Sequence, residues 1–531
     1  MNHIELFAGC GGLSLGLETA GFELLIANEL SPMASETFAY NHLCADLTDD
    51  DTSHLEKVFW VSSQHSRDNV KARLRENPNE ACGLRGKQSD LKEINANKVD
   101  LKRSLFIGSI IDLNRILDSN ATLKRKLKNG FGAGEVDVVS GGPPCQSFSM
   151  AGMRQHSNKR NQLPWEFANF VEKVQPKIAL LENVTGILRA FSVEGKKFHA
   201  WFEVAKAFAG KGYVPICLHV NAKYVGAAQN RPRFILIALR KDVAKKLKKN
   251  SKDSSLLSAL DQSLAFFKKA SSKMVVIEDD LSYYDIDREH AFFEESSLFS
   301  KFLGTKKSHL VSVKEALDDL KDSKKGKESA YVKRINTVFH KVCENPVDKK
   351  VNHAHRANNL HVQARFRLFQ VMNKLEPTEY KEVSKYLRSL DKKDISNSTL
   401  DALMKYKFRN SSGETVEFGN RPSMRMHLTD MHTKKQTQKA LVADVPAPAA
   451  LSIPDDACHY DEKELRTLTV REMARIQSFP DWYEFRSKVT TGGKMRKFEV
   501  PQYTQVGNAV PPLLGMVLGN VCAELIKVAS K

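Results

Sequence analysis

A cysteine on a glycine- and proline-rich loop is the residue of this chain best suited to nucleophilic chemistry. Cys145 follows Gly141-Gly142-Pro143-Pro144 and precedes the polar residues Gln146 and Ser147. The prolines restrict the backbone just before the thiol, and the glycines allow a substrate to approach closely. Most cysteines are small buried hydrophobes, so the loop alone is compatible with either a nucleophile or a core residue.

A carboxylate and two arginines also follow or precede apolar runs. Glu182 comes after four apolar residues, and a partly buried carboxyl group there can exchange protons near neutrality. A helix cap or a structural ion pair is the alternative role for Glu182. Arg231 and Arg233 precede the apolar run 234–239, so either both reach one site or one of them points to solvent. An arginine near Cys145 would lower the pKa of its thiol.

Short apolar runs predict the strands that position these residues. The run 136–139 leads into the Cys145 loop, and 178–181 leads into Glu182. Open α/β sheets bind their ligands at the carboxyl ends of parallel strands, so both side chains are expected at one edge of a sheet. The sequence therefore predicts an α/β fold with a Rossmann-like sheet.

The N-terminus has the pattern of half a nucleotide site. A strand at 4–7, a glycine loop at 8–12 and a helix at 13–20 are followed by a second strand, 22–27, which ends on Asn28-Glu29. Glycines allow close backbone approach, and an acidic residue about 20 positions further on can bind ribose hydroxyls. The loop holds no Lys-Ser/Thr pair, which disfavours a phosphate-binding P-loop.

Composition and charge limit the class of protein. The 531 residues, 41% hydrophobic and 27% charged, predict a globular protein of two or more domains. The formal charge of +18 favours a polyanionic partner, and residues 321–440 hold 26 Lys+Arg against 13 Asp+Glu. We expect no membrane span, no signal peptide and a cytoplasmic location. Eight scattered cysteines without a CxxC pair argue against a disulfide framework and a zinc site, and for a reducing cytosol.

Taken together, the motifs resemble those of the cytosine-5 DNA methyltransferases, in that family's linear order. The resemblance covers roughly residues 1–240 and 460–531. Its motifs are Phe7-Ala8-Gly9-Cys10-Gly11-Gly12, Glu29, Gly142-Pro143-Pro144-Cys145-Gln146, Glu182-Asn183-Val184, Gln229-Asn230-Arg231-Pro232-Arg233, Arg466-Thr467-Leu468-Thr469-Val470-Arg471-Glu472 with Gln477-Ser478-Phe479-Pro480, and Gln505-Val506-Gly507-Asn508-Ala509-Val510-Pro511-Pro512.

The resemblance implies roles for these residues. Cys145 is expected to be the nucleophile, Glu182 the carboxylate facing the cytosine ring, and Arg233, with Arg231 behind it, to orient the base and the thiolate. S-adenosylmethionine is the implied cofactor, and no metal is required. The implied cofactor-binding residues are Phe7, Ala8, Gly9, Gly11, Gly12, Leu13, Glu29, Leu30, Ser109, Ile110, Pro143, Asn508 and Ala509.

The sequence departs from the family pattern in two places. Ser109 stands where the family usually has Asp, so the adenine contact is expected to differ. A polar insertion of about residues 46–99 separates the predicted second and third strands, and its role is open.

The resemblance also implies a division into domains. We expect a catalytic domain at 1–240, a smaller, variable and basic target-recognition region at 241–460, and a C-terminal segment, 461–531, that partly returns to the catalytic domain. A lysine- and serine-rich stretch at 241–258 predicts a surface connector. The basic segment 421–427 predicts a loop that contacts DNA, and 362–372 predicts a helix that either packs or reads DNA. A capping box at Thr469 predicts a helix through Gln477, and a last apolar helix is expected at about 512–528.

The favoured function is site-specific methylation of a flipped cytosine in double-stranded DNA, within a restriction-modification system that pairs the enzyme with an endonuclease. Two alternatives remain. One is a transfer-RNA cytosine methyltransferase on the same scaffold, against which the long middle segment argues. The other is a catalytically silent DNA-binding regulator, which would have no chemical need for Cys145, Glu182 and Arg233 together.

Overall fold

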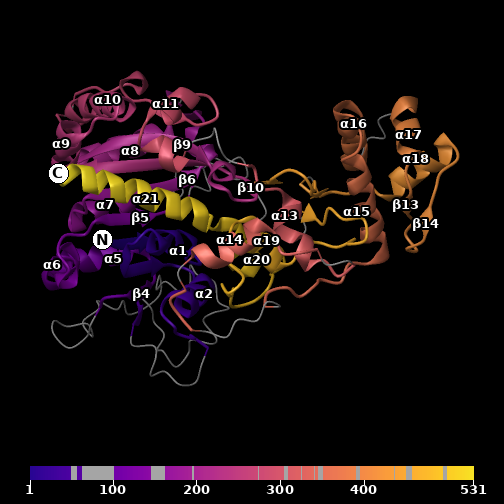
Figure 1. The fold of residues 1–531 in the computed structure, drawn as a ribbon, viewed down its shortest axis with the longest axis horizontal. Helices are drawn as coiled ribbons and strands as arrows, with labels where there is room; N and C mark the ends of the chain where they lie inside the picture. Colours follow the sequence, from indigo (N-terminus) through magenta and orange to yellow (C-terminus); the bar gives the residue numbers. More distant parts are fainter. Residues whose placement is uncertain are drawn as a thin grey trace.

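The structure is a computed structural model of the full chain. It describes residues 1–48, 57–61, 101–144, 162–193, 196–272, 274–303, 309–323, 326–339, 341–344, 351–389, 395–435, 437–449, 457–493, 495 and 499–531. Cys145 and most of the 46–99 insertion lie outside these residues. The described part forms a large domain that carries both chain termini and a smaller domain at the opposite end of the long axis (Figure 1).

A mixed sheet forms the centre of the large domain. Among the described residues it has nine strands in the order β12-β9-β11-β6-β5-β1-β2-β4-β3. The neighbours from β6 to β3 pair in parallel, whereas β11 runs antiparallel to both β6 and β9. The strands are β1 Asn2–Leu6, β2 Glu23–Glu29, β3 Val58–Trp60, β4 Ser104–Ile107, β5 Val138–Gly141, β6 Ile178–Val184, β9 Tyr213–Asn221, β11 Pro232–Arg240 and β12 Tyr283–Asp285.

The winding of the sheet reverses between β1 and β5. The chain moves outward from β1 to β2 and β4, and then returns to the other side of β1 to form β5 and β6. Crossover connections between parallel strands are right-handed, so this reversal places helices on both faces. In doubly wound sheets the ligand-binding crevice lies at such a reversal, which here is at the carboxyl ends of β1 and β5. The predicted α/β, Rossmann-like fold is confirmed.

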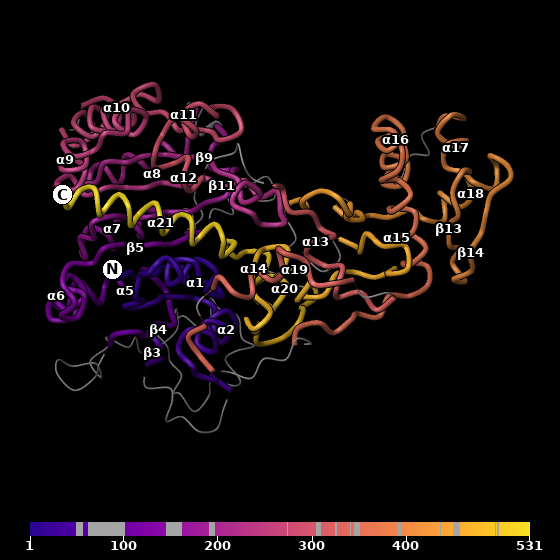
Figure 2. Tube along the Cα trace, viewed as in Figure 1, coloured from indigo at the N-terminus to yellow at the C-terminus, as the bar shows by residue number. Residues whose placement is uncertain are grey.

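Helices cover both faces of the sheet (Figure 2). On one face, α1 packs along α21, and Gly16 makes this possible because a Cβ there would lie 2.3 Å from the backbone nitrogen of Met516. The helices of this domain are α1 Gly12–Thr19, α2 Pro32–His42, α5 Ile110–Ser119, α6 Ala121–Lys128, α7 Leu163–Val174, α8 Ala200–Gly210, α9 Lys241–Asn250, α10 Ser254–Ser271, α11 His290–Glu295, α12 Phe299–Leu303, α13 Val313–Leu317, α14 Ala330–Val338, α19 Val470–Ile476, α20 Gln502–Asn508 and α21 Pro512–Ala529.

The smaller domain has a hydrophobic core of its own. Its buried residues run from Ala364 to Leu465, whereas the buried residues of 241–339 belong to the large core. The predicted recognition region therefore spans parts of both cores. The elements of the smaller domain are α15 Leu360–Met372, α16 Pro377–Arg388, α17 Asn397–Leu403, α18 Arg421–Asp430, β13 Phe408–Arg409, β14 Thr415–Val416, β15 Lys439–Ala440 and β17 Ala457–Cys458.

Short elements complete the fold. The hairpin β7 Phe191–Val193 and β8 Lys196–Phe198 follows the sheet strand β6, and β10 Gln229–Asn230 pairs with β16 Ala447–Pro448. Single turns of 3₁₀ helix are η4 Gly130–Gly132, η6 Thr185–Leu188, η7 Ala222–Val225, η8 Glu278–Asp280 and η9 Asp318–Leu320. The pairing of β10 with β16 connects the segment before Arg231 to residues 447–448.

Several sequence predictions about local structure are confirmed. The Thr469 side chain accepts a hydrogen bond from the Glu472 amide and the Glu472 carboxylate accepts one from the Thr469 amide, so α19 begins with the predicted capping box. The predicted last helix is α21. The 362–372 segment is α15, and its buried residues, such as Phe366 and Phe369, make it a core helix.

Two predictions about local structure were wrong. The segment 421–427 is not a loop: Asn420 caps it, Pro422 lies in its first turn, and Arg421–Asp430 is the helix α18. The stretch 241–258 is not a connector, because Val243 and Leu247 bury one face of α9 in the large core. The 46–99 insertion, whose role the sequence left open, contributes the strand β3, which pairs with β4.

One compositional expectation also needs correction. Cys44 and Cys343 form a disulfide, with their Cα atoms 5.3 Å apart, although scattered cysteines favoured free thiols. Distance along the chain hides such a pairing, since 299 residues separate the two. The helical stretch Gln502–Ala529 is long and apolar enough to cross a membrane by length and composition alone, and 72% of its apolar window is buried inside the protein, as in a core helix.

Candidate active site

The predicted cofactor residues gather around the crevice at the winding reversal. They occupy the ends of four neighbouring strands and of α20. These are Phe7, Ala8, Gly9, Gly11, Gly12 and Leu13 at β1, Glu29 and Leu30 at β2, Ser109 and Ile110 at β4, Pro143 at β5, and Asn508 and Ala509 at α20.

The glycine loop after β1 leaves space beside the backbone. Gly9 has a φ of +55°, which L side chains rarely adopt, and a Cβ there would meet nothing within 4 Å. Gly12 is needed for the opposite reason, because a Cβ there would lie 2.3 Å from the carbonyl oxygen of Val510. The loop is therefore open at Gly9 and closed against the C-terminal segment at Gly12.

Glu29 is held in place by backbone amides. Its Oε2 accepts a hydrogen bond from the Gly9 amide at 2.8 Å, and its Oε1 accepts one from the Ser31 amide at 2.7 Å. Burial raises the pKa of the Glu29 carboxyl, and the two amide hydrogen bonds oppose that rise. A carboxylate fixed in this way, 20 residues after Gly9, is of the type that binds a ribose diol.

Phe7 and Ser109 flank the crevice on either side of Glu29. Phe7 has a positive φ of 55°, is partly buried and packs its ring edge-on against Phe167, with 6.5 Å between centroids. Ser109 is the N-cap of α5, and its hydroxyl accepts a hydrogen bond from the Ile111 amide at 3.2 Å. An Asp could fill the same capping position, so Ser109 keeps the helix start and lacks only the charge.

A buried polar chain supports the glycine loop from behind, and no motif in the sequence indicates it. Glu18 accepts contacts from His42 at 2.6 Å and from Arg103 at 2.7 Å. His42 Nε2 lies 3.0 Å from the hydroxyl of Tyr483, which donates a hydrogen bond to the Cys10 carbonyl. These residues come from α1, α2, the turn before β4 and the C-terminal segment, so only the fold brings them together.

Glu182 and Arg233 form a buried ion pair next to the start of the cysteine loop. Arg233 Nε lies 2.6 Å from Glu182 Oε1, and both residues are buried, with exposed fractions of 7% and 8%. The other carboxylate oxygen borders Gly142, since a Cβ on Gly142 would lie 3.0 Å from Glu182 Oε2. Burial lowers the pKa of Arg233, and Glu182 opposes that shift. Glu182 thus lies beside Gly142 at the start of the cysteine loop, as its position after the apolar run 178–181 predicted.

Arg231 faces a different part of the site from Arg233. Its guanidinium donates hydrogen bonds to the carbonyl oxygens of Gly507 at 2.8 Å and Ala509 at 3.0 Å. Those carbonyls bracket Asn508, which is exposed at the end of α20. Of the two alternatives for the arginines, neither holds in full: both point inward, but only Arg233 contacts Glu182.

Asn183 connects β6 to the cysteine loop. Its side-chain nitrogen donates a hydrogen bond to the Pro143 carbonyl at 2.9 Å, and its oxygen accepts one from the Val184 amide. Pro143 is two residues before Cys145, so Asn183 anchors the described beginning of the loop. The thiol itself lies outside the described residues, and its role as nucleophile stays a prediction.

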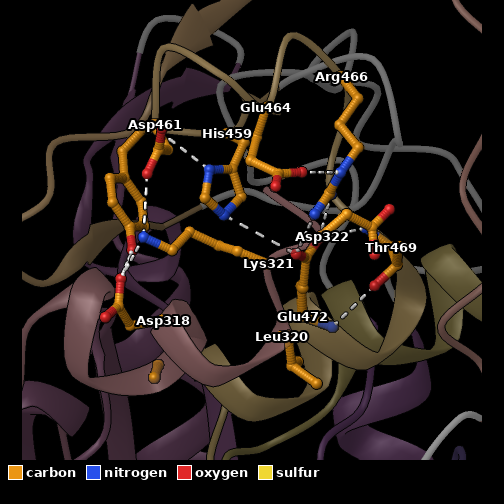
Figure 3. Close-up of polar contacts among 12 residues, drawn as sticks. Asp318, Leu320, Lys321, Asp322, His459, Asp461, Glu464, Arg466, Thr469 and Glu472 are labelled. Atoms are coloured by element: carbon orange, nitrogen blue, oxygen red, sulfur yellow. Dashed lines mark hydrogen bonds and ion pairs between the residues drawn. The ribbon is translucent and has the colours of Figure 1, made fainter. Parts of the chain in front are cut away.

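A second polar cluster joins the smaller domain to the large one (Figure 3). Arg466 bonds Glu472 through both guanidinium NH groups, at 2.8 and 2.9 Å, and Glu464 through its Nε. Lys321 bridges Asp318 and Asp461. The cluster therefore links η9 and the start of α19, in the large domain, with the segment 461–466 that follows β17. Its contacts join the two domains.

Within the described ranges, no group of three or more His, Cys, Asp or Glu residues has the arrangement of a metal site. The site contains the Glu182 carboxylate, its paired Arg233 and an open glycine loop. Such features are typical of doubly wound α/β enzymes that bind nucleoside-containing cofactors.

Comparison with known proteins identifies the family. The sequence profile of the C-5 cytosine-specific DNA methylases matches residues 1–61 and 116–524, so the chain belongs to that family. It is 26% identical to the type II methyltransferase M.AgeI of Thalassovita gelatinovora, with all of both chains aligned. It is 25% identical to M.DdeI of Desulfomicrobium norvegicum, over 98% of this chain and 88% of that one.

A solved structure supports the fold. A prophage-encoded E. coli protein, solved as a candidate DNA modification methyltransferase, superposes with a TM-score of 0.51 over 99% of both chains, at 19% sequence identity. The family match spans both described domains, and it leaves the assignment of single site residues to the geometry above.

Proposed function

We propose that this protein transfers a methyl group from S-adenosylmethionine to carbon 5 of a cytosine in double-stranded DNA. The observation that carries the proposal is the Glu182–Arg233 pair beside Gly142, which follows β5. The neighbouring strand, β1, leads into the open glycine loop. The pair faces the position of the base and the glycine loop faces that of the cofactor. Family membership supports the reaction class.

The residues around the glycine loop fit the cofactor. Gly9 leaves space beside the backbone, the fixed Glu29 carboxylate suits the ribose, and Phe7 offers a ring surface. Asn508, which is exposed and precedes Ala509 at Gly12, would close the same pocket. When bound, S-adenosylmethionine supplies an electrophilic methyl group.

The protein residues make carbon 5 reactive towards that methyl group. The Cys145 thiolate adds to carbon 6, while Glu182 holds a proton at the ring nitrogen, so that carbon 5 becomes enamine-like. After methyl transfer, loss of the carbon 5 proton to a base and breakage of the carbon–sulfur bond release the thiolate. Arg233 keeps Glu182 oriented and favours the thiolate electrostatically. The cytosine must leave the duplex to reach the thiol, which costs a few kcal/mol.

The DNA is proposed to lie between the domains, with the smaller domain contacting the backbone. On α16, a hollow of about 370 Å³ is lined by Tyr380, Lys381, Ser384, Lys385, Arg388 and Ser389. No acidic residue lines it within the described part of the chain, and Lys381 and Lys385 are exposed there. In contrast, Arg421 of α18 is already paired with Asp401. Backbone contact is thus better placed on α16 than on the 421–427 segment.

Relatives named as type II methyltransferases suggest a biological setting. We propose that the enzyme protects chromosomal DNA in the bacterial cytosol, alongside an endonuclease of the same specificity. A transfer-RNA substrate is less favoured, because the matched relatives are named as type II methyltransferases and the matched family as DNA methylases.

The test is methyl transfer from labelled S-adenosylmethionine to unmethylated genomic DNA, followed by base-resolution mapping. The proposal predicts 5-methylcytosine confined to one short motif. Label that appears in transfer RNA and not in DNA would assign the RNA substrate, and no label in either would refute the enzymatic function.

A further inference from the structure

A chain of polar contacts crosses the sheet immediately behind the site. The hydroxyl of Thr185 lies 3.0 Å from His219 Nε2, and His219 Nδ1 lies 3.2 Å from Asp285 Oδ2. Both His219 and Asp285 are 8% exposed. Thr185 is the first residue of η6, directly after β6, while the other two lie on β9 and at the end of β12.

Strand register places this chain on the sheet face opposite to Glu182. Phe234 of β11 pairs with Asn183 on one side and with His219 on the other, and His219 pairs with Asp285. Paired residues project to the same face, whereas adjacent residues on a strand project to opposite faces. Asn183 therefore shares the face of His219, while Glu182 and Arg233 meet on the other.

The two faces together clamp the carboxyl end of β6. On one face, Arg233 holds Glu182. On the other, Asn183 holds the Pro143 carbonyl, and His219 holds Thr185 just two residues further along the chain. A shift at Thr185 would therefore move both the carboxylate and the anchored start of the cysteine loop.

We propose that Thr185, His219 and Asp285 are positioning residues for the methyl-transfer site. The inference rests on the function proposed above. Asp285 Oδ2 lies at ion-pair distance from His219 Nδ1, and the Thr185 hydroxyl lies within hydrogen-bond distance of Nε2, so the imidazole ring is held between the two groups. Asp285 is itself fixed, since its Oδ1 accepts a hydrogen bond from the Asp287 amide at 3.0 Å. These three residues transfer no proton to substrate; they set the place of Glu182.

The expected size of the effect follows from how steeply rate depends on geometry. A misplacement of about 1 Å at a catalytic group costs up to about 100-fold in rate. Removing the Thr185–His219–Asp285 contacts leaves the Glu182–Arg233 pair intact, so we expect a loss of about 10- to 100-fold in the rate of methyl transfer. Binding of cofactor and DNA depends on other residues and is expected to stay within about threefold.

The test compares Thr185→Val, Thr185→Ser and His219→Asn in the full-length enzyme. Single-turnover methyl transfer is measured at saturating S-adenosylmethionine and duplex DNA, together with both dissociation constants and the melting temperature. We expect Thr185→Val and His219→Asn to slow transfer with near-normal binding, and Thr185→Ser to restore the rate because it keeps the hydroxyl.

A matched control removes another histidine–carboxylate contact. His199 Nε2 lies 2.9 Å from Glu278 Oε2 at the start of α8, and His199→Gln is expected to leave the rate unchanged. A wild-type rate in Thr185→Val, or no recovery in Thr185→Ser, would overturn the inference. An equal rate loss in His199→Gln would do the same. A wild-type enzyme that methylates no DNA would instead refute the proposed function.

Discussion

Arg231 and Arg233 lie two residues apart, and the structure assigns them different work. Arg231 donates two hydrogen bonds to the carbonyls of Gly507 and Ala509, next to the predicted cofactor residue Asn508. Arg233 instead pairs with Glu182, which faces the predicted base. Replacing each arginine by methionine should therefore impair two different steps.

The magnitude follows from the contacts that each replacement removes. Hydrogen bonds from a charged donor contribute about 1.5–3 kcal/mol each, so the two made by Arg231 contribute at least about 3 kcal/mol. Without these hydrogen bonds, the cofactor must order the Asn508 segment when it binds, and the lost free energy weakens its binding. At about 1.4 kcal/mol per factor of ten, the weakening is about 100-fold. Arg233→Met leaves the Glu182 carboxylate buried without its partner, and such a loss destabilises a protein by about 3–5 kcal/mol.

Titration calorimetry with S-adenosylmethionine and single-turnover transfer at saturating cofactor separate the two effects. Arg231→Met should raise the cofactor dissociation constant by about 100-fold and keep the saturated rate within about threefold. Arg233→Met should show the reverse, with a slow saturated rate and near-normal cofactor binding. The assignment is refuted if Arg231→Met binds cofactor normally but is slow at saturation.

Two other predictions concern DNA affinity and acid stability. The double variant Lys381→Ala, Lys385→Ala should reduce the slope of the log of the DNA association constant against log salt by about 0.9 for each phosphate that it no longer binds. The double variant Lys245→Ala, Lys246→Ala on α9 is the control. Equal slopes in the two variants would contradict a DNA contact on α16. Burial opposes ionisation of Glu472, but Arg466 outweighs it and holds its pKa at about 2. The Arg466–Glu472 pair should contribute about 3 kcal/mol to the free energy of unfolding above pH ~4.5, and this contribution should disappear as the pH falls towards ~2. In urea unfolding, Glu472→Gln should flatten this dependence on pH. An unchanged dependence would refute the prediction.

Much of the site could be expected from sequence because its residues follow short, ordered motifs. The glycine loop, Glu29 and Glu182 each stand at the end of an apolar run, and parallel strands bring such ends to one edge. The arginines precede the run 234–239, and β11 is antiparallel to β6, so its beginning lies at the same edge. The motif spacing therefore predicted which residues meet, although it did not distinguish the partners of Arg231 from those of Arg233.

What the sequence did not predict depends on contacts between distant segments. Asp285 reaches His219 because β12 extends the sheet beside β9, and nothing in its local sequence marks it. Tyr483 and His42 support the glycine loop across 441 residues. The arginines of the 421–427 segment suggested an exposed loop, but the Asn420 cap and tertiary packing made a helix.

The most direct test of the central claim is covalent capture of the enzyme on DNA. A duplex that carries 5-fluorocytosine at the mapped target base cannot lose a proton from carbon 5, so the enzyme should remain attached after methyl transfer. The account predicts a denaturation-resistant complex for the wild type, with the modified peptide containing Cys145, and none for Cys145→Ser. A complex through another residue, or methylation of DNA by Cys145→Ser at the wild-type rate, would contradict it.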